Sequence, residues 1–143
     1  IENKKKLVYI ADQSFCVSFS TINDQVKLKK FIFSWYQQQA YDVFEDLILY
    51  WKKKLNVRVD SLKIKKLKSR WGSCSSTGVI TMNWLLVKAP KDIISYVVLH
   101  ECCHLVYFNH SKDFWNLVGV HMPDYVTKKS WLKNYGSLLL QNH

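Results

Sequence analysis

The sequence predicts an α+β fold that consists of one long N-terminal helix, a small antiparallel sheet and several shorter helices after the sheet. Three patterns support this prediction: a long stretch without Pro or Gly, two later segments rich in strand-forming residues, and amphipathic segments that follow Pro90. The chain has 143 residues, of which 48% are hydrophobic, and this is enough to form the core of a single domain over residues 1–143.

The long helix is predicted over residues 26–56. Apolar side chains recur in it at spacings of three and four, which places them on one face of a helix, and Asn56 is expected to end it. Residues 1–25 are predicted to form a short β segment ahead of the helix. Leu7–Phe19 alternates roughly and is rich in β-branched and aromatic residues, which favours a short hairpin or two edge strands.

The sheet is predicted from two segments within residues 62–143, the part of the chain that also carries the motifs described below. Leu62–Leu67 starts with strict alternation of apolar and polar residues, which is typical of a half-buried strand. Ser73–Gly78 is rich in turn-forming residues, and Val79–Val87 is predicted as the second strand. The two strands are therefore expected to form an antiparallel hairpin.

Three helices are predicted after the sheet. Pro90 breaks the chain and suits the first turn of a helix, where Asp92 adds a favourable negative charge. The predicted ranges are 92–106, 111–121 and 124–140, with Pro123 between the last two.

The chain is basic, with a net charge of +10. The positive electrostatic field of such a chain favours acidic partners, and nucleic acid is one candidate. The lysines are scattered over several predicted elements and join no recognition motif, so a solvated basic surface is the simpler interpretation. The longest apolar stretches are far shorter than a membrane span, so no membrane partner is expected. Nothing in the sequence indicates an oligomeric state.

The four cysteines are Cys16, Cys74, Cys102 and Cys103, and none forms a C-x-x-C pair. A zinc ribbon and a disulfide framework are therefore not indicated. Reduced thiols predict a cytoplasmic protein, in which the four cysteines are small, semi-buried side chains.

A metal-binding motif lies on the first helix after the sheet, as His100-Glu101-Cys102-Cys103-His104. Residues four apart leave one face of a helix, so the two imidazoles can bind one zinc ion. Glu101 then lies beside a water molecule on the metal, as in the H-E-x-x-H zinc metallopeptidases. The alternative is a pair of hydrogen-bonded core histidines, which the apolar neighbours disfavour because buried polar groups need partners.

A catalytic zinc needs a third protein ligand and an open position. His110 follows His104 by six residues, the spacing of the H-E-x-x-H-x-x-G-x-x-H peptidases, although Tyr107 stands in place of the glycine. Asn109 is expected to provide the turn instead, because Asn tolerates a positive φ. His110 is the predicted third ligand, and His121 is the alternative that would reach the site from the next helix.

Beyond the metal motif, the chain resembles a known family over about Leu62–Leu132. An ordered series of motifs carries the resemblance: Lys68-Ser69-Arg70-Trp71-Gly72-Ser73-Cys74, Gly78-Val79-Ile80-Thr81-Met82-Asn83-Trp84, Ala89-Pro90, Tyr96-Val97-Val98-Leu99-His100-Glu101-Cys102-Cys103-His104-Leu105, Asn109-His110-Ser111, Phe114-Trp115 and Met122-Pro123-Asp124-Tyr125. This series is similar to the YgjP-like metallopeptidase domain, a family of metal-dependent hydrolases related to the WLM and SprT-like peptidases.

The resemblance implies a zincin-like fold and one catalytic zinc ion held by His100, His104 and His110. It also implies that Glu101 is the general base and that the substrate is a peptide or protein. In zincins an edge strand beside the active-site helix accepts an extended peptide, and Val79–Asn83 is expected to be this strand. The N-terminal part is shorter than is common in the family.

Three further residues are candidates for accessory roles. Arg70 is either a ligand for a substrate carboxylate or phosphate, or a partner of a carboxylate or of Trp71. Asn83 either fixes a turn or binds the substrate backbone. Tyr125 is either a stabiliser of the oxyanion or a buried aromatic residue. The structural role is the favoured one for each.

Two other functions compete with the peptidase. The first is a basic binding module for nucleic acid with a structural zinc, or a combined form in which the protease acts on DNA-bound proteins, as SprT-like relatives do. The second is a small-molecule amide hydrolase, because the same metal chemistry serves other amides.

Overall fold

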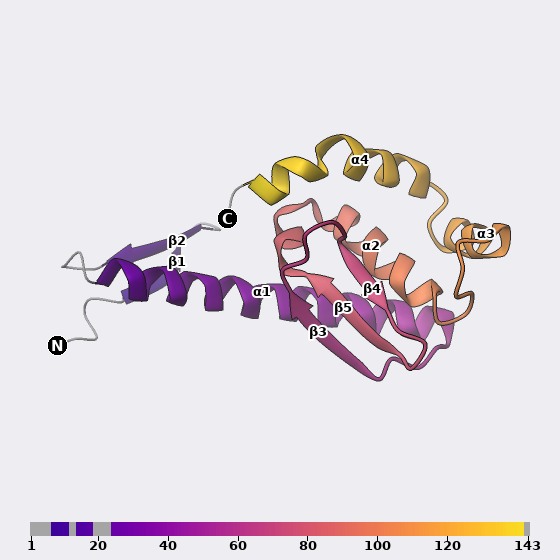
Figure 1. The fold of residues 1–143 in the computed structure, drawn as a ribbon, viewed down its shortest axis with the longest axis horizontal. Helices are drawn as coiled ribbons and strands as arrows, with labels where there is room; N and C mark the ends of the chain where they lie inside the picture. Colours follow the sequence, from indigo (N-terminus) through magenta and orange to yellow (C-terminus); the bar gives the residue numbers. More distant parts are fainter. Residues whose placement is uncertain (1–6, 12–13, 19–23, 142–143) are drawn as a thin grey trace. The chain divides into compact units, whose positions relative to one another are not determined.

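The computed structural model describes residues 7–11, 14–18 and 24–141, and Figure 1 shows its elements in chain order. The chain divides into two compact units, residues 1–38 and residues 39–143, and each is described by itself. The described ranges contain both helices and strands, and the helices exceed the strands in length, with the strands grouped in a hairpin and a small sheet, which confirms the α+β class.

The first unit contains a hairpin and the start of the long helix. Strands β1 (Leu7–Ala11) and β2 (Ser14–Ser18) pair antiparallel, with Leu7 opposite Ser18. The predicted short β segment is thus present. Helix α1 (Asp24–Leu55) begins in this unit and continues into the second one.

The end of α1 follows from one residue. Asn56 has a φ of 54°, the left-handed conformation that Asn adopts more readily than most residues. The N–H of Val57 then donates to the carbonyl of Lys52 at 3.0 Å, and that of Asn56 to Lys53 at 3.3 Å. These bonds satisfy the last carbonyls of the helix, and they confirm Asn56 as its end.

The sheet of the second unit has three strands in the order β3-β5-β4. They are β3 (Ser61–Lys65), β4 (Gly72–Cys74) and β5 (Val79–Asn83). β4 pairs antiparallel with β5, but β3 pairs with β5 in parallel. The prediction of an all-antiparallel sheet is therefore wrong. Alternation along a strand shows which faces are buried but carries no information on the direction of its partner.

Two further predictions about the second strand are also wrong. β5 is the central strand and is paired on both sides, so it cannot accept an added peptide. It also ends at Asn83, because Trp84–Lys88 forms the short 3-10 helix η2. Trp84, Leu85 and Leu86 are all buried, and three buried side chains in succession do not fit a strand with one solvent-facing side.

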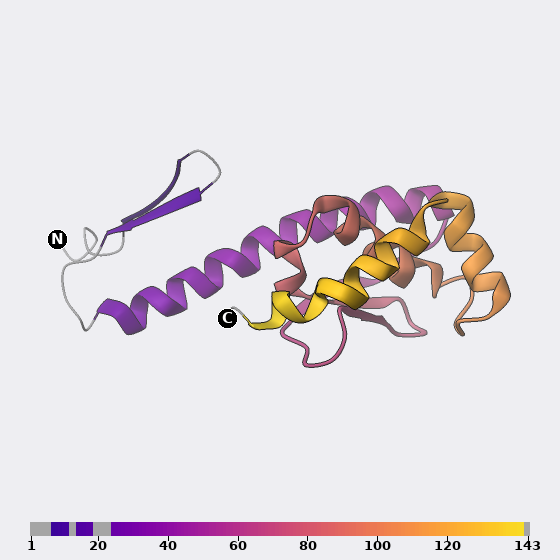
Figure 2. The ribbon, with the colours of Figure 1, turned by 90° about the horizontal axis from the view of Figure 1, so that it is seen from above.

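Three helices follow, α2 (Lys91–Cys103), α3 (Lys112–His121) and α4 (Tyr125–Gln141). In Figures 1 and 2, α2 lies between the sheet and α4, so it is covered on both sides. Its central residues from Tyr96 to Leu99 are all buried. The C-terminal part of α1 also packs on α2, where the indole N–H of Trp51 donates to the hydroxyl of Ser95 at 2.9 Å. The fold therefore holds α2 rigidly from several directions.

Two predicted absences concern membranes and disulfides. Within the described ranges, no helix is long and apolar enough to cross a membrane. Cys74, Cys102 and Cys103 are free thiols, and the side chain of Cys16 lies outside the described residues.

Candidate metal centre

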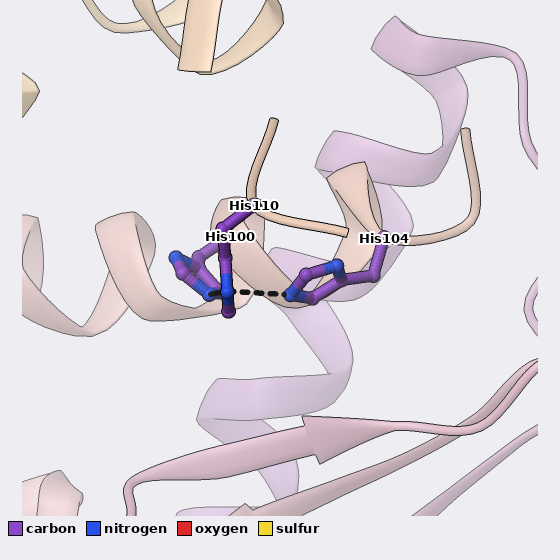
Figure 3. Close-up of side chains that lie close together, drawn as sticks. All are labelled: His100, His104 and His110. Atoms are coloured by element: carbon purple, nitrogen blue, oxygen red, sulfur yellow. Dashed lines mark hydrogen bonds between the residues drawn. The ribbon is translucent and has the colours of Figure 1, made fainter. Parts of the chain in front are cut away.

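Three histidine side chains meet at the end of α2. His100 lies in the last turn of the helix, and His104 is its C-cap residue. His110 comes from the loop that follows, immediately before Ser111, whose hydroxyl caps α3 by accepting the N–H of Phe114. Figure 3 shows the three rings, here called the three-histidine cluster, turned toward one another.

The distances in the cluster fit a shared cation. Nε2 of His110 lies 3.1 Å from Nε2 of His100 and 3.1 Å from Nε2 of His104. The candidate ligand atoms of all three residues are within 4.8 Å of one another. Nitrogen ligands about 2.0–2.1 Å from a tetrahedral zinc ion would lie roughly 3.3 Å apart. The three rings thus present a nearly complete set of donors, with room for a fourth ligand.

A backbone contact fixes the tautomer of one ring. Nδ1 of His104 lies 3.2 Å from the carbonyl oxygen of Tyr107, which can only accept a hydrogen bond. The proton of the neutral ring is therefore on Nδ1, and Nε2 keeps its lone pair for the cluster. Hydrogen bonds of this kind commonly orient histidine ligands of metals.

The cluster also requires neutral rings. Burial is the main cause that lowers the pKa of His100 to about 3, and the neighbouring His104, His110 and Lys129 lower it further. Burial also lowers the pKa of His104. Both rings are therefore neutral at physiological pH, which is the form that binds metal.

Two aromatic residues of α3 pack against the histidine rings of the cluster. Phe114 is fully buried and stacks on His104, with 4.5 Å between the ring centroids. Trp115 stacks on His110 at 5.9 Å. Their ring contacts therefore orient two of the three histidine rings.

Glu101 is beside the cluster but faces the sheet. It is 6% exposed, and burial raises the pKa of its carboxyl to about 7, while the positive charge of Arg70 opposes this rise. A Cβ atom at Gly72 would lie 3.1 Å from Cγ and 3.2 Å from Oε2 of Glu101. The absence of a side chain at position 72 therefore makes room for the carboxylate.

Two cavities open on either side of this carboxylate. One, the His110 cavity, has a volume of ≈ 330 Å³ and is lined by the three-histidine cluster, Cys74 and Phe108. The other, the Trp71 cavity, has a volume of ≈ 280 Å³ and extends toward Trp71 and α4. Arg70, Gly72, His100 and Glu101 line both cavities. They are two arms of one cleft that meet at the candidate reactive groups.

Strand β4 forms a wall of this cleft. The backbone of Trp71 and that of Ser75 bond to β5, each through a bond of 2.9 Å. Because backbone groups alternate in direction along a strand, those of Gly72 and Cys74 point away from β5. Among the strands that the structure describes, none pairs with β4 on that side. The open edge beside α2 is thus that of β4, and not that of Val79–Asn83.

The other predicted residues lie in different places. His121 is outside the cluster and packs against Trp51, at 6.1 Å between ring centroids. Asn109 is not among the described residues with positive φ, so the expected left-handed turn is wrong. The turn after α2 is made instead by backbone bonds, such as that from the N–H of Tyr107 to the carbonyl of Cys103 at 2.9 Å.

The three residues predicted to have accessory roles lie in different surroundings. Arg70 lines both cavities. Asn83 is fully buried, and its amide donates to the carbonyls of Leu67 and Arg70 and accepts from the N–H of Leu85. Its side chain is therefore structural. Tyr125 stacks on Trp115 at 5.4 Å and lines neither cavity.

Several residues that line the cleft were not predicted as site residues, among them Gly72, Tyr96 and Lys129. Tyr96 lies one turn before His100 on α2, and this spacing was a detectable signal. Gly72 belongs to the motif of residues 68–74, but its closeness to Glu101 depends on tertiary packing. Lys129 had no sequence signal, because it comes from α4.

Comparison with known proteins gives one family and two similar structures. The family model described as YgjP-like, metallopeptidase domain matches residues 2–135. The chain is similar to the crystal structure of the metallopeptidase zymogen of Pyrococcus abyssi abylysin, with 25% identity and a TM-score of 0.57, over 66% of this chain and 94% of that chain. The metallopeptidase zymogen of Methanocaldococcus jannaschii jannalysin is similar in fold, with 23% identity and a TM-score of 0.56, over 66% and 89% of the two chains. No curated protein matches the sequence.

Proposed function

The chain belongs to the YgjP-like metallopeptidase family, and we propose that its metal is zinc and that Glu101 is the general base of peptide-bond hydrolysis. The observation that carries the proposal is the convergence of three Nε2 atoms from His100, His104 and His110. Three neutral imidazoles with an open fourth position are a common donor set of catalytic zinc sites.

The chemistry of the site follows from its residues. A zinc ion bound there would polarise the scissile carbonyl and lower the pKa of a water molecule to about 7. The Glu101 carboxylate takes the proton of the attacking water and gives it to the leaving amine. Because burial raises the pKa of this carboxyl to about 7, it can accept and release a proton near neutral pH.

The substrate would lie along β4 as an extended chain. The backbone N–H and C=O groups of Gly72 and Cys74 face the cleft edge and can pair with a peptide backbone. A free strand edge of this kind favours a peptide or protein over a small amide, which would leave these backbone groups without a partner. The amide hydrolase is therefore the weaker alternative.

The test combines metal content with peptide cleavage. We expect about one zinc ion per chain, measured by elemental analysis, and cleavage of a proteome-derived peptide library by the zinc-loaded protein. Glu101→Gln should keep the zinc and lose cleavage by a factor of about 100 or more. Glu45→Gln makes the same chemical change at an exposed position on α1 and should leave both unchanged.

Two results would count against the proposal. A protein without stoichiometric zinc would remove the metal assignment, and persistent cleavage by Glu101→Gln would remove the assigned base. The nucleic-acid module and the protease of DNA-bound proteins stay predictions from the net charge of +10. A cytoplasmic location likewise stays a prediction, which the free thiols favour.

A further inference from the structure

The Trp71 cavity has a specific chemical character. Its walls are largely apolar and aromatic, with Trp71, Tyr96, Val97 and Leu132 around a volume of ≈ 280 Å³. Tyr96 and Val97 are buried in α2, so this part of the wall is rigid. The volume is large enough for one amino-acid side chain, and the cavity opens directly beside His100 and Glu101.

Two cations, Arg70 and Lys129, also line this cavity, whereas Glu101 is its one acidic lining residue. Neither cation forms an ion pair with another described residue; the neighbouring Lys128 pairs with Asp124, the residue just before α4. Arg70 faces Glu101 closely enough to act on its carboxyl. The negative charge of Glu101 therefore offsets the positive charge of Arg70, and no acidic residue of the cavity offsets the positive charge of Lys129.

The position of Lys129 is fixed by its contacts. Its Nζ lies 4.1 Å from the centroid of the Trp115 ring, a cation–π contact that holds an exposed side chain in place. Trp115 in turn stacks on His110 of the three-histidine cluster. The ammonium group is therefore held by Trp115, next to the three-histidine cluster, and Lys129 lines the Trp71 cavity together with His100.

We propose that the Trp71 cavity selects a carboxylate group of the substrate next to the scissile bond, with Lys129 as the main recognition residue. This inference rests on the proposed peptidase function of the same cleft. The carboxylate belongs either to an Asp or Glu side chain or to the C-terminus of the substrate. A basic side chain is disfavoured, because it would bring a third positive charge into a cavity with two.

Peptidyl hydroxamates test this proposal without any need for cleavage. The hydroxamate chelates the metal, so the neighbouring side chain is held beside the cavity. The first pair of compounds differs in one side chain, which is Glu or Gln, and a Leu compound serves as the apolar reference. The second pair carries Gln and differs at its end, which is a free carboxylate or an amide. On zinc-loaded protein in low salt, calorimetry should give about tenfold tighter binding for the carboxylate member of one pair.

Substitutions on α4 identify the residue responsible. Lys129→Met removes the charge and keeps a stem of similar shape, and because Lys129 is exposed the core is unaffected. It should reduce the carboxylate preference to about twofold or less. Lys133→Met removes one charge from an exposed position of the same helix, outside both cavities, and should preserve the preference.

Each outcome decides a separate question. Equal binding of carboxylate and amide members to zinc-loaded protein overturns this inference and leaves the peptidase function intact. A preference that survives Lys129→Met overturns the role of Lys129. If the protein holds no zinc and binds no hydroxamate, the proposed function fails and this inference fails with it. A preference in one pair alone identifies the side chain or the terminus as the source of the carboxylate.

Discussion

Substitution of Gly72 by Ala tests whether empty space beside Glu101 is required for catalysis. The new Cβ would lie 3.1 Å from Cγ of Glu101, 3.2 Å from its Oε2 and 3.1 Å from Sδ of Met82. Ordinary van der Waals contacts of a Cβ are 3.4–4 Å, so the Glu101 side chain must move by a few tenths of an ångström. The backbone groups of β4 that face the cleft are unchanged by this substitution.

The magnitude follows from these distances. A displacement of about 1 Å in a catalytic group can cost roughly 100-fold in rate, so a shift of a few tenths should lower kcat/KM by about tenfold. Met82 is fully buried, so overpacking should also lower the free energy of unfolding by about 1–3 kcal/mol. Zinc stoichiometry should stay the same, because the atoms nearest to the new methyl group belong to Glu101 and Met82 and not to a histidine.

The assay measures kcat/KM on a cleaved library peptide, zinc content and thermal unfolding for the same preparations. Gly119→Ala on α3 is the matched control, because its Cβ would meet the Tyr125 ring at an ordinary 3.4 Å. This control should retain activity and gain up to about 1 kcal/mol in the free energy of unfolding. A Gly72→Ala enzyme with the kcat/KM of the wild type would refute the argument that this glycine makes room for the base.

Three other predictions address the metal and the fold. His110→Ala should lower zinc affinity strongly in a competition titration, whereas His121→Ala should leave it unchanged, since His121 packs on Trp51. Zinc at about 100 times its Kd should raise the free energy of unfolding by about 2.7 kcal/mol, and a chelator should reverse this in thermal melts. Asn83→Ala should lower the free energy of unfolding by about 2 kcal/mol or more in urea titrations, because buried backbone groups lose their partners.

The sequence by itself determined the features that depend on local spacing. Histidines four apart leave one face of a helix, so His100 and His104 had to meet wherever α2 lies. His110 is close enough along the chain to turn back to them, and the structure places its Nε2 3.1 Å from both. Asn56 ended α1 as expected, because a left-handed residue can be recognised from its type.

The tertiary structure alone decided what lies around these three histidines. Strand patterns show which faces are buried but not which strands pair, and so the parallel β3 and the edge strand β4 were not predicted. The space that Gly72 leaves for Glu101 joins a strand to a helix, and Lys129 reaches the cleft from α4. Such contacts depend on how separate elements pack, and no spacing along the chain encodes them. The sequence thus located the three histidines of the cluster, and packing determined the cleft that surrounds them.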